Sequence, residues 1–217
     1  MRPSSSVPFL PAPLKGLLFL LFALAGSPLA AAPALQVTTQ TESPPETGEI
    51  TVFTVHSPLG EYAFRPPKGW RLEVDAPARQ LFLHSPDDTS HLEITFAPLN
   101  PALAPDAATN ALREQVTARF PGAVILEEFS AYTAGLAGPG FDLRWQPAKG
   151  VTSAVRLAFV PRPAGTLEFR LTSLPDQFAA VRPLFGAVLT SFIERVPASS
   201  QSADRPPSSS SFSFFGR

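Results

Sequence analysis

Histidine is the side chain best suited to binding metal or moving protons near neutral pH, and this chain has three. His84 and His91 flank residues 85–90, a Ser-Pro-Asp-Asp-Thr-Ser stretch with the residue types of a turn. If that stretch closes a hairpin, two imidazoles would lie near Asp87 and Asp88 and could form a weak metal site with nitrogen and oxygen ligands. The alternative, which we favour, is an exposed polar loop. We therefore predict no metal site and no cofactor.

The residue patterns of nucleophilic and phosphate chemistry are absent from the sequence. There is no cysteine, which excludes a thiol nucleophile, a disulfide, a thiolate metal site and a lipid-bearing cysteine. No serine stands in a Gly-x-Ser-x-Gly elbow. Residues 135–140 contain several glycines but no Gly-Lys-Ser/Thr, so we interpret residues 138–140 as a turn between strands instead of a phosphate loop. We predict that the protein is not an enzyme.

Charged side chains are the remaining candidates for a functional surface. Glu127 and Glu128 are adjacent, so in a strand they point to opposite faces and cannot form a close acid–base pair by themselves. Six other charged residues lie on predicted strands and would share the outward face if the apolar residues point inward: Glu93, Asp142, Arg144, Arg156, Glu168 and Arg170. We interpret them as a solvated ladder of opposite charges. The functional alternative is a binding face for a polar ligand or an anionic partner, held by arginine forks.

The elements that must position these side chains are mainly strands. Alternation, β-branched runs and turns that contain Gly or Pro predict strands over residues 50–55, 61–65, 70–74, 81–84, 92–97, 124–132, 141–145, 151–160 and 166–172. In the fifth of these, Leu92, Ile94 and Phe96 alternate with two polar residues. Short turns join many of the neighbours, so we expect antiparallel pairing, because a parallel crossover needs a dozen residues or more.

Two amphipathic helices interrupt and follow the strands. Asp106 is a suitable N-cap, and apolar residues then recur at spacings of three and four as far as a Pro-Gly pair, which predicts a helix of about 14 residues. A second helical pattern runs from Asp176 to Arg195, with Pro183 at the first position of a restarted or kinked helix. The fold class is therefore α+β, an antiparallel β-sheet flanked by helices.

Residues 1–34 have the pattern of a secretory signal peptide. Arg2 and Lys15 precede an apolar run of about ten residues, and small residues follow it up to an Ala-Pro-Ala triplet. We predict cleavage before Leu35, with cleavage after Ala30 as an alternative. An uncleaved membrane anchor fits less well, because the run is short for a bilayer core of about 30 Å. We predict no transmembrane segment after cleavage.

The rest of the chain divides into three parts. Residues 35–48 are expected to be an extended linker, residues 49–196 a single folded domain, and residues 197–217 a disordered tail rich in Ser and Pro. The tail ends in Phe-Ser-Phe-Phe-Gly-Arg, which could serve as a short docking peptide. The net charge is −1 and there is no basic run, so we expect no nucleic-acid partner.

The order of these elements, together with a few spaced residues, resembles one known superfamily. It joins the photosystem extrinsic protein PsbP, the nuclear transport factor Mog1 and the bacterial DcrB-like domains. The matching residues are Tyr62, Phe64, Pro67, Gly69 and Trp70 at the front, Gly140 in the middle, and Ser191 and Phe192 at the end. The resemblance covers most of residues 49–196. It implies an α/β/α sandwich and an accessory or binding role.

We therefore expect an exported, non-enzymatic accessory protein that contacts another protein or an envelope component. The alternatives are a carrier of a small ligand or metal, and a hydrolase without recognisable motifs. The export signal argues against the intracellular GTPase role of Mog1-type proteins. Trp70 and Trp145 are expected to be core anchors.

Overall fold

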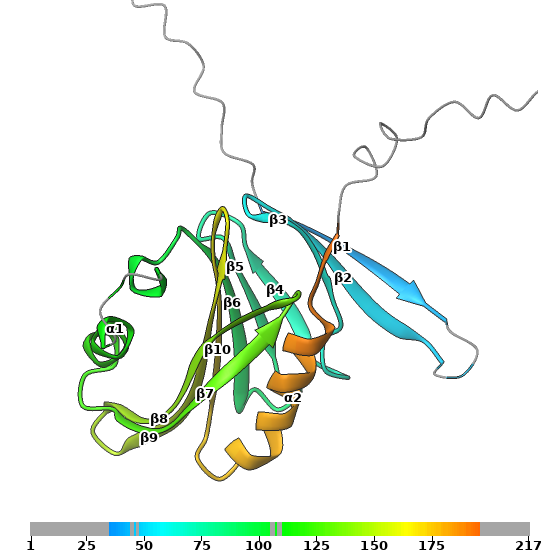
Figure 1. The fold of residues 1–217 in the computed structure, drawn as a ribbon. Helices are drawn as coiled ribbons and strands as arrows, with labels where there is room; N and C mark the ends of the chain where they lie inside the picture. The colour runs from blue at the N-terminus through cyan, green and yellow to red at the C-terminus, as the bar shows by residue number, and fades with distance from the viewer. Residues whose placement is uncertain (1–34, 44–45, 47, 105–106, 108–109, 196–217) are drawn as a thin grey trace, which may run out of the picture. The chain divides into compact units, whose positions relative to one another are not determined.

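The computed structural model describes residues 35–43, 46, 48–104, 107 and 110–195 (Figure 1). These residues form eleven strands in two antiparallel sheets, two α-helices and one short 3-10 helix, η1 (Pro101–Leu103). The predicted signal peptide, the predicted tail and the predicted helix cap Asp106 lie outside the described residues. No helix within the described ranges is long and apolar enough to cross a membrane.

The smaller sheet has four strands in the order β1 (Gln36–Glu42), β2 (Ile50–Ser57), β3 (Gly60–Phe64) and β11 (Ile193–Arg195). β1 replaces most of the extended linker expected over residues 35–48, and each of its residues opposes one of β2. Its side chains are mostly exposed, so the apolar alternation that reveals a strand is missing from the sequence. β11 pairs with β3 where the sequence predicted the end of a helix.

The larger sheet has seven strands in the order β4 (Arg71–Asp75), β5 (Gln80–His84), β6 (Ser90–Ala97), β10 (Gly165–Ser173), β9 (Val151–Arg162), β8 (Leu136–Ala148) and β7 (Val124–Thr133). It consists of two antiparallel meanders, β4 to β6 and β7 to β10, which join where β6 pairs with β10. β4 and β7 are its two edges.

The turn between β7 and β8 lies at Ala134 and Gly135, and not at residues 138–140 as the glycines suggested. Both turn residues have positive φ, 46° and 79°. Gly138 and Gly140 belong to β8, where a Cβ would collide with the backbone of β9. These glycines therefore permit a close approach of backbones inside the sheet instead of reversing the chain.

Both helices differ in extent from the sequence prediction. α1 covers Ala111–Arg119, shorter than the expected 14 residues, and Asn110 is its N-cap. α2 covers Phe178–Ser191 without a restart, with Pro183 in its interior. Pro183 cannot donate to the carbonyl of Ala179, but the helix continues because its apolar side, including Phe185, is buried.

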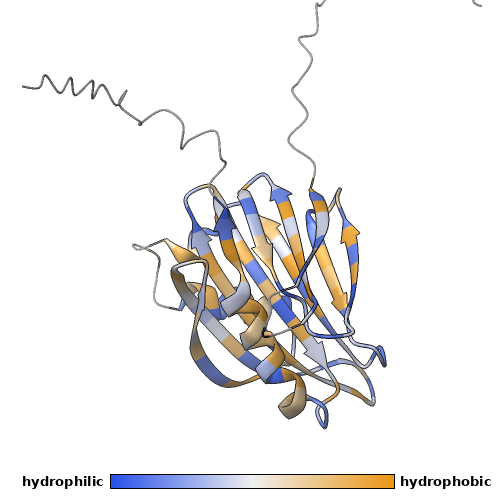
Figure 2. Cartoon of the chain, turned by 90° about the vertical axis from the view of Figure 1, so that its right-hand side faces the viewer, coloured by the Kyte–Doolittle hydropathy of each residue, from blue (hydrophilic) through white to orange (hydrophobic). Residues whose placement is uncertain are grey.

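Two apolar cores lie on the two faces of the seven-stranded sheet. The larger core joins one face to α2 and to the smaller sheet, and it contains Trp70, which is buried as expected. The smaller core joins the opposite face of β8 and β9 to α1, and there Trp145 is half-buried, with its ring 5.2 Å from that of Phe120. Figure 1 shows α1 on one side of the sheet and α2 on the other. Hydrophilic and hydrophobic residues alternate along several strands (Figure 2).

The predicted class, an antiparallel α+β fold, is confirmed. The simple α/β/α sandwich is not confirmed, because a second sheet shares one face of the seven-stranded sheet with α2.

Candidate functional site

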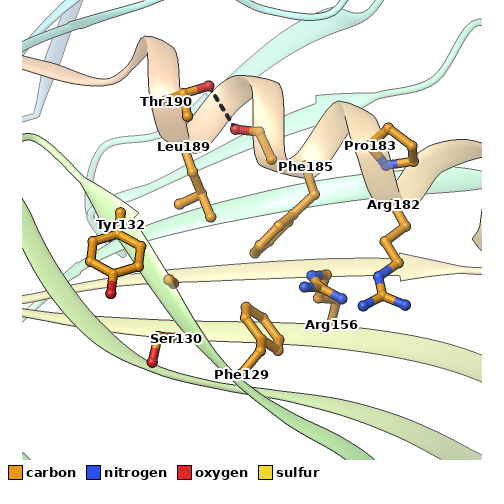
Figure 3. Close-up of a pocket in the computed structure, with 11 residues that line it drawn as sticks. Phe129, Ser130, Tyr132, Arg156, Arg182, Pro183, Phe185, Leu189 and Thr190 are labelled. Carbon is orange, nitrogen blue, oxygen red and sulfur yellow. Dashed lines mark hydrogen bonds between the residues drawn. The ribbon is translucent and has the colours of Figure 1, made fainter.

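A pocket of about 390 Å³ lies between the edge strand β7 and helix α2 (Figure 3). Its walls are mostly apolar, and two arginines lie at one end. The lining residues are Phe129, Ser130, Ala131 and Tyr132 from β7, Arg156 from β9, and Arg182, Pro183, Phe185, Gly186, Leu189 and Thr190 from α2. The pocket volume falls within the range of small-ligand sites, at its lower end.

The position of Phe129 depends on a glycine in the next strand. Phe129 opposes Gly140 across the β7–β8 pair. A Cβ at Gly140 would collide with the Phe129 ring, so the ring occupies the space that a side chain would fill. From there the ring reaches the guanidinium of Arg156, whose Cζ lies 3.6 Å from the ring centroid. The guanidinium and aromatic face are thus in cation–π contact.

Arg156 reaches the pocket because of the register of β9. It opposes Asp142 in β8 and Leu171 in β10, so it shares the face that packs toward α2. Its Nη1 donates to both carboxylate oxygens of Asp142, at 2.8 Å and 2.6 Å. A second aromatic ring, that of Phe185 from α2, lies 5.6 Å from its Cζ. The cation is therefore enclosed by two rings and a carboxylate.

Asp142 and Arg156 belong to a group of four charges. Arg182 Nη2 donates to Glu127 at 2.8 Å and lies 3.8 Å from Asp142. Burial raises the pKa of the Asp142 carboxyl, and the two arginines oppose that rise. Burial lowers the pKa of the Arg156 guanidinium, and Asp142 opposes that change. Two guanidinium groups and two carboxylates thus neutralise one another at the end of the pocket.

The α2 side of the pocket contains the only glycine of the described helices, Gly186. A Cβ at this position would have no neighbour within 4 Å, so no packing requirement excludes a side chain. Glycine in a helix interior costs about 1 kcal/mol relative to alanine. The sequence therefore gives up helix stability at a position that lines the pocket.

The six charged residues predicted to share one face are divided between both faces of the sheet. Asp142, Arg144 and Arg156 lie on the α2 face, whereas Glu93, Glu168 and Arg170 lie on the α1 face. The expectation of one solvated ladder was wrong. It failed because the sheet has a core on each face: the apolar residues of β8 pack toward α1, whereas those of β6 and β10 pack toward α2, so the polar sides of these strands face opposite ways.

Several of these charged residues are also buried, whereas a solvated ladder would be exposed. Glu93 and Asp142 are each 2% exposed, and Arg156 is 9% exposed. Glu93 pairs with Arg170 and also accepts from Gln80 Nε2 at 3.0 Å. On the same face Glu168 pairs with Arg119 of α1, while Arg144 is exposed on the other face. Of the predicted residues, only Asp142 and Arg156 come together at the pocket.

The hairpin proposed for His84 and His91 is present, and the two residues oppose each other across β5 and β6. Their ring centroids lie 6.3 Å apart. In the part of the chain that the structure describes, no three His, Cys, Asp or Glu residues are grouped so that they could hold a metal ion. Asp87 accepts from Ser85, Thr89 and the Thr89 amide, which is turn chemistry.

Sequence reasoning missed Phe129 and Arg182 as pocket residues. The available signal was local: Pro183 and Gly186 are unusual inside an apolar helical pattern, and both line the pocket. The contact of Phe129 with Arg156 depends on pairing between three strands and leaves no local signal.

No family model matches the chain, and no curated protein matches it. Solved structures similar to this chain include cyanobacterial PsbP from Synechocystis, with 14% identity and a TM-score of 0.43, covering 78% of this chain and 96% of that one. LpqN of Mycobacterium tuberculosis, described as involved in cell envelope biogenesis, has 13% identity and a TM-score of 0.41, covering 73% of this chain and 90% of that one.

A protein of unknown function from Pseudomonas aeruginosa has 17% identity and a TM-score of 0.40, covering 73% of this chain and 98% of that one. A PsbP is thus among the structural neighbours of the chain, as the resemblance in the sequence predicts.

Proposed function

We propose that the chain is an exported, non-enzymatic binding protein whose β7–α2 pocket receives an apolar side chain of a partner protein. The predicted signal peptide over residues 1–34 and the absence of cysteine support export without a lipid anchor. The proposal includes an accessory role, in which the protein contacts another protein or an envelope component.

The observation that carries the proposal is the open space above Gly186. A helix that served only to cover the sheet would gain stability from alanine there, because nothing within 4 Å opposes a Cβ. Apolar walls from Phe185 and Leu189 adjoin that space. An aliphatic or aromatic side chain from a partner would bury apolar surface in it, at about 25 cal/mol per Å².

The charged group at the end of the pocket supports binding over catalysis. A catalytic acid or base needs a side chain free to exchange a proton with a substrate. Asp142 is held by Arg156, and Glu127 is held by Arg182. The pairs instead give the pocket a rigid, neutral end wall.

Small apolar molecules fit the same space, and a carrier of such a ligand is the second candidate, favoured by the pocket volume of about 390 Å³.

The test uses N-acetyl-leucinamide as a probe of the pocket, with amide chemical shifts of the full-length protein as the readout. We expect saturable shifts at Gly186 and Phe129, with millimolar affinity. Gly186→Trp, which fills the pocket, should abolish them. Gly186→Ala is the matched control: it should retain them and raise the free energy of unfolding by up to about 1 kcal/mol. Shifts that persist in Gly186→Trp would show that the pocket is not the site.

A further inference from the structure

The outer edge of β7 is open along part of its length. β7 is the last strand of its sheet, so none of the described strands pairs with that edge. The first half is protected by a bulge between Ile125 and Glu127 and by the consecutive carboxylates of Glu127 and Glu128. Residues 129–132 contain no bulge, charge or proline. An edge of this kind pairs readily with another extended chain.

The adjoining turn determines which backbone groups face that edge. Ala134 and Gly135 form a two-residue hairpin turn with positive φ at both positions, and Thr133 opposes Leu136 across it. The residues that flank such a turn face each other through its hydrogen bond. Residues of an antiparallel strand alternate between facing the partner strand and facing away. Counting back from Thr133, the residues that face away are 132 and 130.

Ser130 and Tyr132 therefore present their N–H and C=O groups at the open edge. Their side chains lie on the opposite face of the sheet from Phe129, yet both residues line the pocket. An exposed backbone edge accounts for this. Each residue carries one donor and one acceptor, so the edge offers two of each to an incoming strand.

The pocket and the open edge form one continuous site. At the end of β7 the edge is closed, because the Ala134 amide donates to the Phe192 carbonyl at 3.0 Å and Thr133 Oγ1 donates to the Leu189 carbonyl at 2.7 Å. A strand added beside β7 would lie about 4.8 Å from it and direct alternate side chains toward the α2 side. There the space above Gly186 is free.

We propose that a partner protein adds an extended segment to β7, pairs with Ser130 and Tyr132, and places one apolar side chain in the pocket above Gly186. This inference rests on the proposed function and names the form in which the partner binds. A second copy of this chain fits less well, because its own α2 covers the corresponding face of its sheet and would compete for the same space.

The test measures binding of the full-length protein to the peptide Lys-Thr-Leu-Thr-Leu-Thr-Leu-Thr-Lys by calorimetry. A peptide of the same composition with its three leucines consecutive is the control for alternation. Two further peptides carry N-methyl groups, either on the leucine amides or on the threonine amides. Because amide direction alternates along a strand, one methylated set should lose binding and the other should retain it.

Ser130→Pro removes the outward amide of β7, at an edge position where proline is tolerated in a sheet. We expect it to weaken peptide binding by about tenfold or more, whereas Ser130→Thr leaves the affinity unchanged. On binding to the unmodified protein, the Ser130 and Tyr132 amides should become protected from hydrogen exchange.

Several outcomes would overturn the proposal. Equal binding of the alternating and control peptides, or of the two methylated peptides, would exclude strand addition. If Gly186→Trp abolishes binding of N-acetyl-leucinamide while Ser130→Pro leaves peptide binding unchanged, the pocket stands and strand addition is wrong. If Gly186→Trp changes neither ligand, the proposed function is wrong as well.

A second copy of this chain or its own carboxyl-terminal segment could instead occupy the open edge of β7. Each would give a different experimental result, and either result would overturn the assignment to a partner protein. A dimer that becomes monomeric in Ser130→Pro would place a second copy at the edge. Tighter peptide binding by the double variant Phe212→Ala, Phe214→Ala would place the carboxyl-terminal segment of this chain there.

Discussion

His91 is half-buried on the α1 face of the seven-stranded sheet, with His84, Glu93 and Arg170 as its charged or titratable neighbours. Burial lowers the pKa of its imidazole below the ordinary value, and Arg170 and His84 lower it further. The folded state therefore takes up the proton less readily than the unfolded chain. Stability is complete above about pH 6.5 and is lost as the pH falls from there toward the lowered pKa.

We predict that His91→Gln removes this loss of stability at low pH. The free energy of unfolding in urea, measured at pH 7.5 and at pH 5.0, should fall more between these two values for the unmodified protein than for the variant. The exposed His56, whose Nδ1 lies 3.2 Å from Glu61, provides the control. His56→Gln should keep the pH dependence associated with His91, and equal pH dependence in the unmodified protein and His91→Gln would contradict the prediction.

Arg156 illustrates the limit of single-residue prediction from this sequence. Its charge and its position on a strand were correctly recognised, and so was its ability to hold a carboxylate. The face of the sheet on which Arg156 lies was not recognised, because the neighbours Val155 and Leu157 are as apolar as Ala154 and Ala158. When both faces of a central strand are buried, hydrophobicity has no period, and only the pairing partners decide which side an arginine takes.

At the scale of elements, β8 depends on two glycines, Gly138 and Gly140, where a Cβ would collide with neighbouring atoms. Gly140→Ala should force the Phe129 ring away from Arg156, because the added Cβ occupies the place of the ring. We predict a loss of about 1–3 kcal/mol in the free energy of unfolding, as for other overpacked sites. The measurement is urea unfolding followed by circular dichroism.

Gly150→Ala is a suitable comparison for strain without crowding. Gly150 has φ 80° in the β8–β9 turn, and a Cβ there meets nothing within 4 Å. The Gly150→Ala variant should be destabilised by backbone strain alone, and its amide chemical shifts around Phe129 should be unchanged. If Gly140→Ala likewise leaves those shifts unchanged, the ring does not depend on that glycine.

Elements with a clear apolar period were predictable from the sequence, and those without one were not. β6 and β10 were recognised because Leu92, Ile94 and Phe96, and likewise Leu167, Phe169 and Leu171, alternate with polar residues. In the structure the two sets oppose each other on one buried face. β1 was missed because its side chains are exposed on both faces. β11 was missed because three residues cannot display a period, and its pairing with β3 depends on where α2 ends.

At the scale of the folded unit, the two sheets share one core. Trp70 is the last residue of the connection from β3 to β4 and is 9% exposed within that core. Arg162 of β9 also reaches the smaller sheet, with its Nη2 3.3 Å from Glu194 of β11. Because contacts of this kind cross between the sheets, we expect both sheets to unfold in one cooperative transition.

Trp70→Ala should therefore destabilise the whole unit by about 3–5 kcal/mol. Urea unfolding followed by circular dichroism and by the fluorescence of Trp145 should give coincident transitions, both shifted to lower urea. Trp145→Phe, at the half-buried position of the smaller core, should shift the midpoint less. Two separate transitions, or a midpoint unchanged by Trp70→Ala, would show that the sheets do not share the stability assigned to this core.

Leu35 is 3% exposed and belongs to the larger core, and β1 begins at the next residue. If a peptidase cuts before Leu35, as the sequence predicts, the new amino terminus is itself a core residue. No spacer then separates the translocated segment from the folded unit. Under that prediction, Leu35 would take its place in the larger core only once the residues before it have left the export channel, and release from the channel would then coincide with the completion of folding.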